Sequence, residues 1–468
     1  MKSVALILLF IVFHACAGEQ PFPKMDESAQ EYVDRYGAWV ESIPVEDRAW
    51  DEMQAIQSVL LEKLDGKRLV VGTKKDGYEE SASFVEKNQD LIDDIVQCAQ
   101  NPYLGMPVAE MWNPEPILGE PTSFDILLPH LQSLRTQSQM LLIQAIQCSN
   151  NGRVDQAISY LEDVQSFKEF VPLINCVIEE LVKNSIDSMI DKAVLTGCLD
   201  VSSWSESQLE YLQGLYTHSD RSADEALSME RWQIKNMLNW IYEDAIEGRI
   251  TALGVGRFFA VQELSATHVE RPRKMDRVMK MMNQCGSYSD QIRMLDLFFD
   301  AHRLDFEMNP WERNVSHVRP VVREITSSEE KFAPVYEFLP IYSSFYKTQL
   351  HWWMLRCAAS CVVELQLYQA KYGDYPESLD ELDDDLQERW IDQMSGKRYG
   401  YRLIENHPVL YSFGHDRDDD QGRPISDHNG EVDVEWPEFL TIDEFKEALR
   451  DEPESIDGDW ILYPLVAN

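Results

Sequence analysis

The sequence predicts a mainly α-helical protein, in which a multi-helix N-terminal region of helical hairpins is followed by a small α+β module. Three observations support this. Apolar residues recur at three- and four-residue steps over most of the chain, proline and glycine clusters separate these stretches, and short runs typical of strands lie near the C-terminus. With 468 residues, 44% of them hydrophobic, the chain can bury a sizeable core.

The N-terminus is typical of a secretory signal sequence. An apolar run at residues 4–13 is followed by Ala15, Cys16 and Ala17, which form an A-x-A cleavage site before Gly18. The run is too short to cross a bilayer, which takes ~20 apolar residues. We therefore expect an exported protein, periplasmic, on the cell surface or secreted, with no membrane span once the signal is removed. The alternative is a lipid anchor at Cys16, although the preceding His14 is unusual beside a lipidated cysteine.

Helical patterns then follow one another along the chain. The expected helices cover residues 26–64 with a break at Pro44, then 81–100, 171–195, 205–216 and 223–248. A break at residues 150–153 joins two further helices in an N-G-x-h-D-x-A-h pattern that resembles a tetratricopeptide hairpin, with Ala145 and Ala157 allowing close approach. We find no clear recurrence of this unit, so a single helical hairpin is preferred over a peptide-binding superhelix.

These patterns divide the chain into four segments. A signal peptide occupies residues 1–17, an N-terminal helical region 18–121, a central α-helical domain with the hairpin 122–340, and an α+β module 341–468. Five prolines between residues 102 and 121 mark the first internal boundary as a stiff connector.

The C-terminal module begins with a long helical pattern. One buried face is expected to carry Trp352, Leu355, Ala359, Val362, Leu365, Tyr368 and Tyr372. Gly373 ends this helix, Pro376 forces extended backbone, and Leu379 and Leu382 can then fold back onto the core. A strand around residues 409–412, an amphipathic helix starting at Thr441 and a final strand at 459–463 complete the module.

Three motifs in this module resemble type II secretion pseudopilins. These are Tyr368-x4-Gly373-x-Tyr375-Pro376-x2-Leu379, Ser395-Gly396-Lys397-x2-Gly400-Tyr401-x-Leu403, and Val409-Leu410-Tyr411-Ser412-x-Gly414-x-Asp416. They resemble, in order, the helix-to-loop passage, the start of the sheet, and the strand and loop of the major pseudopilin. Most of the chain is similar to uncharacterised exported proteins of planctomycete-type bacteria with this module behind a long helical region. Pseudopilins begin with a processed G-F-x-x-x-E helix, whereas these motifs start at Tyr368, so filament assembly is not expected.

Charge and cysteine content restrict the partners and the chemistry. A formal charge of −40, from 82 acids and 42 bases, disfavours nucleic acid and anionic lipid, because phosphate contacts need a positive patch. A protein partner in the envelope is expected instead. Without Cys16 an odd number of seven cysteines remains, so they cannot all pair. Cys357 and Cys361 are expected to be small buried thiols. A disulfide such as Cys148 with Cys176 is an open alternative.

No strong catalytic signature occurs. The sequence lacks H-E-x-x-H, G-x-S-x-G and Walker loops, and Ser344-x2-Lys347 fits an S-x-x-K pattern without its companion motifs. The candidate acid–base groups are His302, Asp305, Glu307 and His317, although such histidines are usually surface or hydrogen-bonded core residues. We expect a non-catalytic binding or scaffolding protein of the envelope, and the alternative is a cell-surface hydrolase whose active site no motif marks. An aromatic groove, for which Trp352 and Trp353 are candidates, would favour a scaffold.

The strongest chemical pattern is an acidic loop at residues 416–427. Aspartates at alternating positions suit calcium, which accepts six to eight oxygen ligands, and the expected ligands are Asp416, Asp418, Asp420 and Asp427. The spacing is not that of an EF-hand. The resemblance to major pseudopilins, which bind calcium after the same strand, also implies calcium. A solvated acidic turn, or a transition metal bound with His415 or His428, are the alternatives.

Calcium should raise the stability of the C-terminal module, because a divalent cation removes the repulsion between the loop aspartates. At a hundred times its dissociation constant it should add ~2.7 kcal/mol to the free energy of unfolding. Replacing Asp416 and Asp420 by Asn should abolish that gain. Thermal melting in calcium and in chelator, at constant ionic strength, measures the gain in stability. Identical melting curves would show that the loop is only a solvated acidic turn.

Overall fold

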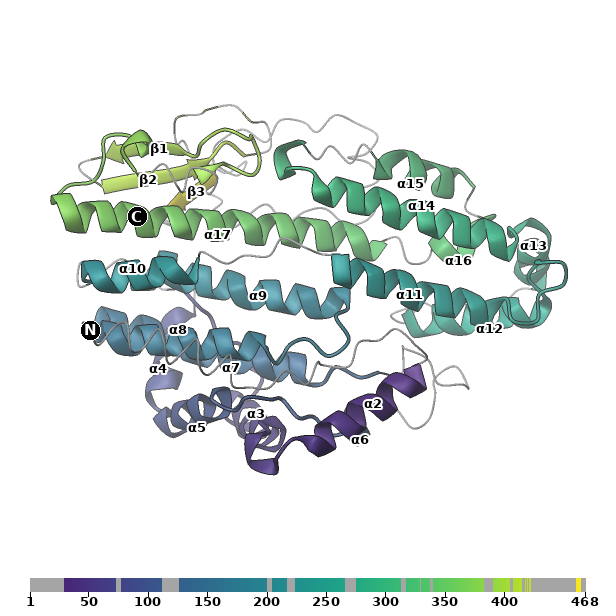
Figure 1. Cartoon of the computed structure of the whole chain (residues 1–468), viewed down its shortest axis with the longest axis horizontal. Coiled ribbons are helices and arrows are strands. Elements are labelled where there is room, and N and C mark those ends of the chain that lie inside the picture. Colours follow the sequence, from purple (N-terminus) through teal and green to yellow (C-terminus); the bar gives the residue numbers. More distant parts are fainter. Residues whose placement is uncertain are drawn as a thin grey trace.

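The structure is a computed structural model, and it describes residues 29–72, 77–111, 126–199, 204–216, 224–265, 275–312, 317–328, 330–336, 340–382, 390–404, 407–414, 417, 419, 421 and 460–463. Within these residues the protein has sixteen α-helices and a three-stranded sheet (Figure 1). The predicted mainly helical class with a small C-terminal sheet is therefore confirmed. The predicted signal sequence and the predicted helix starting at Thr441 lie outside the described residues.

The helices form two groups, and the last helix follows the second group in the chain but packs on the first. The first group is α2 (Ala29–Ser42), α3 (Trp50–Leu64), α4 (Tyr78–Glu86), α5 (Gln89–Ala99), α6 (Val108–Met111), α7 (His130–Asn150), α8 (Val154–Lys168), α9 (Val177–Ala193) and α10 (Glu206–Leu215). The second is α11 (Asp224–Ile241), α12 (Ala252–Ser265), α13 (Met275–Gln284), α14 (Tyr288–Glu307), α15 (Val318–Ser327) and α16 (Ala333–Tyr336). The long α17 (Pro340–Tyr372) returns along the first group and leads into β1 (Gly400–Ile404), β2 (His407–Ser412) and β3 (Trp460–Tyr463).

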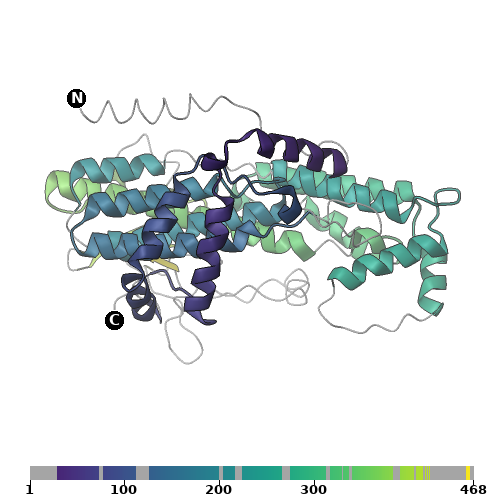
Figure 2. The same ribbon diagram turned by 90° about the horizontal axis from the view of Figure 1, so that it is seen from below.

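The first group is layered. In Figure 1 the sheet lies on one side of α17, α9 and α10 lie on the other, and α7 and α8 follow beneath them. The helix α3 is seen nearly end-on in Figure 1 and lengthwise in Figure 2, so it crosses the long helices. None of the helices in the described ranges is long and apolar enough to span a bilayer.

The helix α17 is more deeply buried than its sequence pattern predicts. Every residue from 352 to 365 is buried, whereas a single buried face was expected. Both sides of the helix are covered, because α9 and α10 pack on one side and β3 contacts the other. The expectation fails in the opposite sense at the C-terminal end, where Tyr368 is half-buried and Tyr372 is 61% exposed. Residues 370–374, at the end of the helix and directly after it, are all exposed.

The passage from helix to sheet follows the prediction. Gly373 adopts a φ of 94° and ends α17, and its backbone amide donates a hydrogen bond to the Gln369 carbonyl at 2.8 Å. Leu379 and Leu382 are buried against the larger core, as expected. The antiparallel sheet has the order β1-β2-β3. Gly400 is required in β1, because an added Cβ would lie 2.0 Å from the ring of Tyr411, its partner on β2.

In the N-terminal half, one predicted helix boundary is confirmed and one predicted helix proves to be two. The predicted hairpin is present as α7 and α8, with Ala145 and Ala157 fully buried. The single helix expected over residues 81–100 is divided into α4 and α5. Asn88 causes the break, because its side-chain amide donates to the Phe84 carbonyl at 2.7 Å and its side-chain oxygen accepts from Lys63 at 2.7 Å.

The described residues form two large hydrophobic cores. The larger core takes residues from the expected segments 18–121, 122–340 and 341–468, for example Trp50, Leu161 and Leu365. Most residues of the second core come from α11–α16. The module at 341–468 therefore does not bury its long helix by itself. Trp311, from the second group, packs on Gly396 of the module, where an added Cβ would lie 2.5 Å from the indole.

A buried polar network joins the layers around α17. Arg356 donates to Asp191 of α9 at 3.1 Å and to the Leu215 carbonyl of α10 at 2.6 Å. The side chains of Arg356 and Asp191 are 6% and 0% exposed. One turn earlier on α9, Asp187 pairs with Lys168 of α8 at 2.7 Å. Burial raises the pKa of Asp191 to about 6, although Arg356 opposes the rise. Four helices therefore depend on one set of charges.

Replacing Arg356 by Met should lower the free energy of unfolding by about 3–5 kcal/mol, because it leaves the buried Asp191 carboxylate without its partner. The double variant Arg356→Met/Asp191→Leu should recover much of the loss, since it removes both charges. Urea unfolding measures both. The matched control is Arg293→Met, whose pair with Glu324 at 3.4 Å is half-exposed and should contribute about 0–1 kcal/mol. Equal losses for Arg356→Met and Arg293→Met would contradict the role of the buried pair.

Candidate functional site

The predicted calcium ligands Asp416, Asp418, Asp420 and Asp427 lie outside the described residues. One further loop aspartate, Asp419, is described, and its carboxylate accepts from the Tyr411 hydroxyl at 3.1 Å and from the Gln421 amide at 2.8 Å. Within the described ranges, no three His, Cys, Asp or Glu side chains gather as a metal site would require. Calcium binding therefore stays a prediction.

The residue that organises the base of this loop is Asp392, which the sequence reading missed. Its fully buried carboxylate accepts four hydrogen bonds, and the donors are Ser412 Oγ at 2.7 Å and the amides of Met394, Ser395 and Phe413 at 3.1, 3.2 and 3.3 Å. An acid three residues before a Ser-Gly pair is a recognisable signal, because aspartate commonly hydrogen-bonds the backbone of a following turn. Asp392 thus fixes the point where β2 ends and the acidic loop begins.

The structure brings together only part of the predicted acid–base set. Asp305 is fully buried, and its Oδ1 lies 2.7 Å from Nδ1 of His317, whose side chain is 43% exposed. The other oxygen, Oδ2, accepts from the Val318 amide at 3.3 Å, so Asp305 also caps the start of α15. His302 is buried beside Phe298, and burial lowers its pKa to about 4. Glu307 points to Arg303 at 3.9 Å instead.

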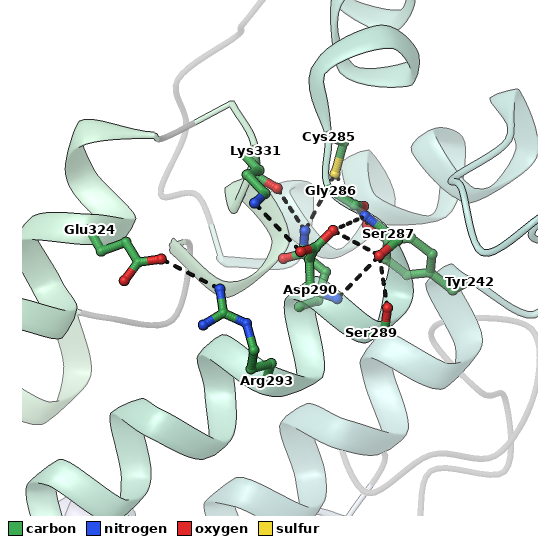
Figure 3. A network of polar contacts seen from close by, with 10 residues as sticks. Tyr242, Cys285, Gly286, Ser287, Ser289, Asp290, Arg293, Glu324 and Lys331 are labelled. Atoms are coloured by element: carbon green, nitrogen blue, oxygen red, sulfur yellow. Dashed lines mark hydrogen bonds and ion pairs between the residues drawn. The ribbon is translucent and has the colours of Figure 1, made fainter.

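A second polar network starts α14, and Figure 3 shows how its members converge. The Ser287 amide donates to Asp290 Oδ2 at 3.0 Å and the Asp290 amide donates to Ser287 Oγ at 3.3 Å, which is a capping box. Lys331 lies 3.5 Å from Asp290 Oδ1, and the Tyr242 hydroxyl donates to the Gly286 carbonyl at 2.8 Å. The Ser287 hydrogen bond lowers the pKa of Asp290. The network therefore joins the start of α14 to Tyr242, the residue after α11, and to Lys331, in the segment before α16.

The cysteines and the two tryptophans that the sequence marked as candidates are core residues. All seven described cysteines are free and buried, which confirms the expectation for Cys357 and Cys361. Burial raises the pKa of the Cys198 thiol to about 12, so it is not a reactive thiolate. Trp352 and Trp353 are 5% and 8% exposed and belong to the larger hydrophobic core. The side chains of Ser344 and Lys347 lie outside the described residues.

Two surface hollows are defined by the described residues. One, of about 460 Å³, follows the outer face of α14 from Tyr288 to Asp300. The other, of about 190 Å³, lies at the start of α9 beside Cys176 and Glu179. There the Glu179 carboxylate accepts from the amides of Leu173 and Cys176 at 2.7 and 3.1 Å, and burial raises its pKa to about 7. Neither of these two hollows is lined by a histidine.

The exposed end of α17 carries an aromatic surface with acids beside it. We call this the tyrosine surface, and it comprises Tyr368, Tyr372, Asp374, Glu377 and Glu381. The two tyrosine rings lie 4.5 Å apart, centroid to centroid, and Tyr372 is the most exposed aromatic side chain in the described part of the chain. The Tyr368 hydroxyl donates to Glu381 at 2.9 Å. Exposed aromatic groups beside fixed charges are typical of binding surfaces.

The buried carboxylate of Asp163, on α8, has no obvious structural role. It is 9% exposed, and its Oδ2 has no hydrogen-bond partner among the described residues. Burial, with a smaller contribution from Glu162, raises its pKa to about 7. The folded chain therefore holds this proton up to about pH 7, whereas the unfolded chain loses it near pH 3.8.

The free energy of unfolding should consequently fall as pH rises from about 4 to about 7, because the folded state binds more protons over this interval. Asp163→Asn should reduce this slope and raise stability at pH 8 by about 1–3 kcal/mol, since it removes an unpaired buried charge. Urea unfolding at several pH values measures both effects. Asp93→Asn, at an exposed site on α5, is the control and should leave the slope unchanged. If Asp163→Asn leaves the pH dependence of the free energy of unfolding unchanged, another group is responsible for it.

Comparison of the chain with protein families, with curated proteins and with solved structures gives no match. The function is therefore inferred from the residues themselves.

Proposed function

We propose that this chain is an exported, non-catalytic binding or scaffolding protein of the cell envelope, with a protein partner and a calcium-stabilised C-terminal module. The observation that carries this proposal is the tyrosine surface at the end of α17. Tyr372 is 61% exposed on a helix whose residues 352–365 are all buried. Exposed aromatic side chains on a rigid element supply binding energy at small entropic cost.

The use of polar side chains elsewhere supports the same proposal. Arg356 and Asp191 join helices, Asp392 orders a loop, and Ser287 and Asp290 cap α14. Each of these groups is bound by other residues of the same chain, so they stabilise the fold that carries the tyrosine surface. The signal-like sequence at residues 1–17 supports export.

One observation favours a cell-surface hydrolase as the second candidate. Asp305 binds Nδ1 of the half-exposed His317 at 2.7 Å, which orients the ring and leaves its other nitrogen available to a substrate. In a catalytic triad a carboxylate placed in this way orients the imidazole, which is the group that transfers the proton. Its other oxygen caps α15, which gives the same carboxylate a structural role.

A crosslinking experiment separates the two candidates. The full-length chain with an affinity tag, crosslinked in the native envelope, should recover one protein partner at a reproducible ratio. His317→Gln should recover the same partner, because the proposed function does not use this ring. Recovery of the chain alone, together with hydrolysis of ester or peptide substrates that His317→Gln abolishes, would identify the hydrolase instead.

A further inference from the structure

We propose that the tyrosine surface binds a cationic segment of a protein, rich in lysine and arginine. This inference rests on the proposed binding function and names the chemistry of the partner.

The ring pair is held in place before any partner arrives. Tyr368 and Tyr372 are one helical turn apart, with ring centroids at 4.5 Å. Tyr368 donates to Glu381 Oε2 at 2.9 Å, while Glu381 Oε1 accepts from the amides of Glu377 and Ser378 at 2.7 and 3.1 Å. The loop after α17 therefore fixes the inner ring, and the outer ring packs on it. A surface ordered in this way loses little entropy on binding.

The rings already accept a cation from their own chain. The Lys371 ammonium lies 5.2 Å from the centroid of the Tyr372 ring. This is within the distance at which the negative face of an aromatic ring attracts a cation. A lysine or arginine of a partner can make the same contact with the exposed parts of the ring pair.

The surrounding charges have the complementary sign. Residues 374–382 contain Asp374, Glu377, Asp380 and Glu381 and no lysine or arginine. Asp380 pairs with Arg398, whereas Asp374 and Glu377 are exposed, so acids still outnumber the one lysine at the rings, Lys371. Acids beside exposed aromatic rings favour a cation and repel an anion.

Other occupants fit these observations less well. A neutral sugar could stack on the rings, but it would gain nothing from the run of acids. An apolar segment would likewise gain nothing from the acids beside the rings. A cationic segment uses both features, because its side chains can contact the rings and the carboxylates together.

The test uses the full-length chain and a short fluorescein-labelled peptide of alternating lysine and serine, followed by fluorescence anisotropy. Tyr372→Ala should weaken binding about threefold or more, since it removes a cation–π contact. Asp374→Asn/Glu377→Gln should weaken binding and reduce its dependence on sodium chloride, because screening acts on exposed charges. A peptide of alternating glutamate and serine should not bind.

Matched controls separate this surface from general attraction to an acidic chain. Tyr211→Ala removes another exposed tyrosine that contacts a glutamate, Glu162, and Glu62→Gln/Glu86→Gln neutralises two exposed acids on other helices. Both variants should bind the peptide as the unaltered chain does. Equal weakening by a control and by its counterpart would overturn the proposal, as would unchanged binding by Tyr372→Ala or displacement of the peptide by a neutral oligosaccharide. Circular dichroism of each variant should show an unchanged fold.

The envelope experiment distinguishes this inference from the proposed function. If Tyr372→Ala recovers the same crosslinked partner in the same amount, the surface is not where that partner binds and the inference fails, while the proposed function stands. If the unaltered chain recovers no partner, the proposed function fails, and the peptide titration alone decides the chemistry of the surface.

Discussion

The buried pair of Arg356 and Asp191 is the interaction around which the layers of this protein are arranged. It joins α17 to α9, and the second Arg356 contact, to the Leu215 carbonyl, adds α10. Taking two charges out of water is costly, and a buried pair adds little net stability compared with apolar residues of the same shape. The pair instead determines how α17 is aligned with α9. We infer that α17 packs against α9 in the register that brings these charges together, because any other register would bury them unpaired.

This alignment has consequences for the C-terminal module. The helix α17 is covered by α9 and α10 on one side and by the sheet on the other, so the module shares its core with the helices that precede it. On the sheet side, Leu410 and Leu462 belong to this shared core, and close contacts add to the order. Asp392 binds the end of β2, Gly400 receives the Tyr411 ring, and Gly396 receives Trp311 from the second group of helices. The module thus depends on both helical groups for its position.

The distribution of polar side chains also bears on function. Within the described residues, the prominent buried charges cap helices, pair across layers or order a loop, as Asp305, Asp191 and Asp392 do. The aromatic side chain that α17 exposes at its far end belongs to a different class, because it satisfies no structural requirement of the core. The tilted ring pair of Tyr368 and Tyr372 at that end is the feature on which the proposed binding function rests.

Local patterns in the sequence determined the helical class, the α7–α8 hairpin, the end of α17 at Gly373 and the return of Leu379 and Leu382 to the core, because periodicity and turn chemistry act over a few residues. The calcium site predicted at residues 416–427 also rests on a local pattern, and its expected ligands lie outside the described residues. Only the tertiary structure decided that α17 is buried on both sides, that Arg356 meets Asp191 across 165 positions of the chain, and that Asp305 meets His317. These contacts depend on how layers stack, and no spacing within one helix encodes which distant helix will cover it.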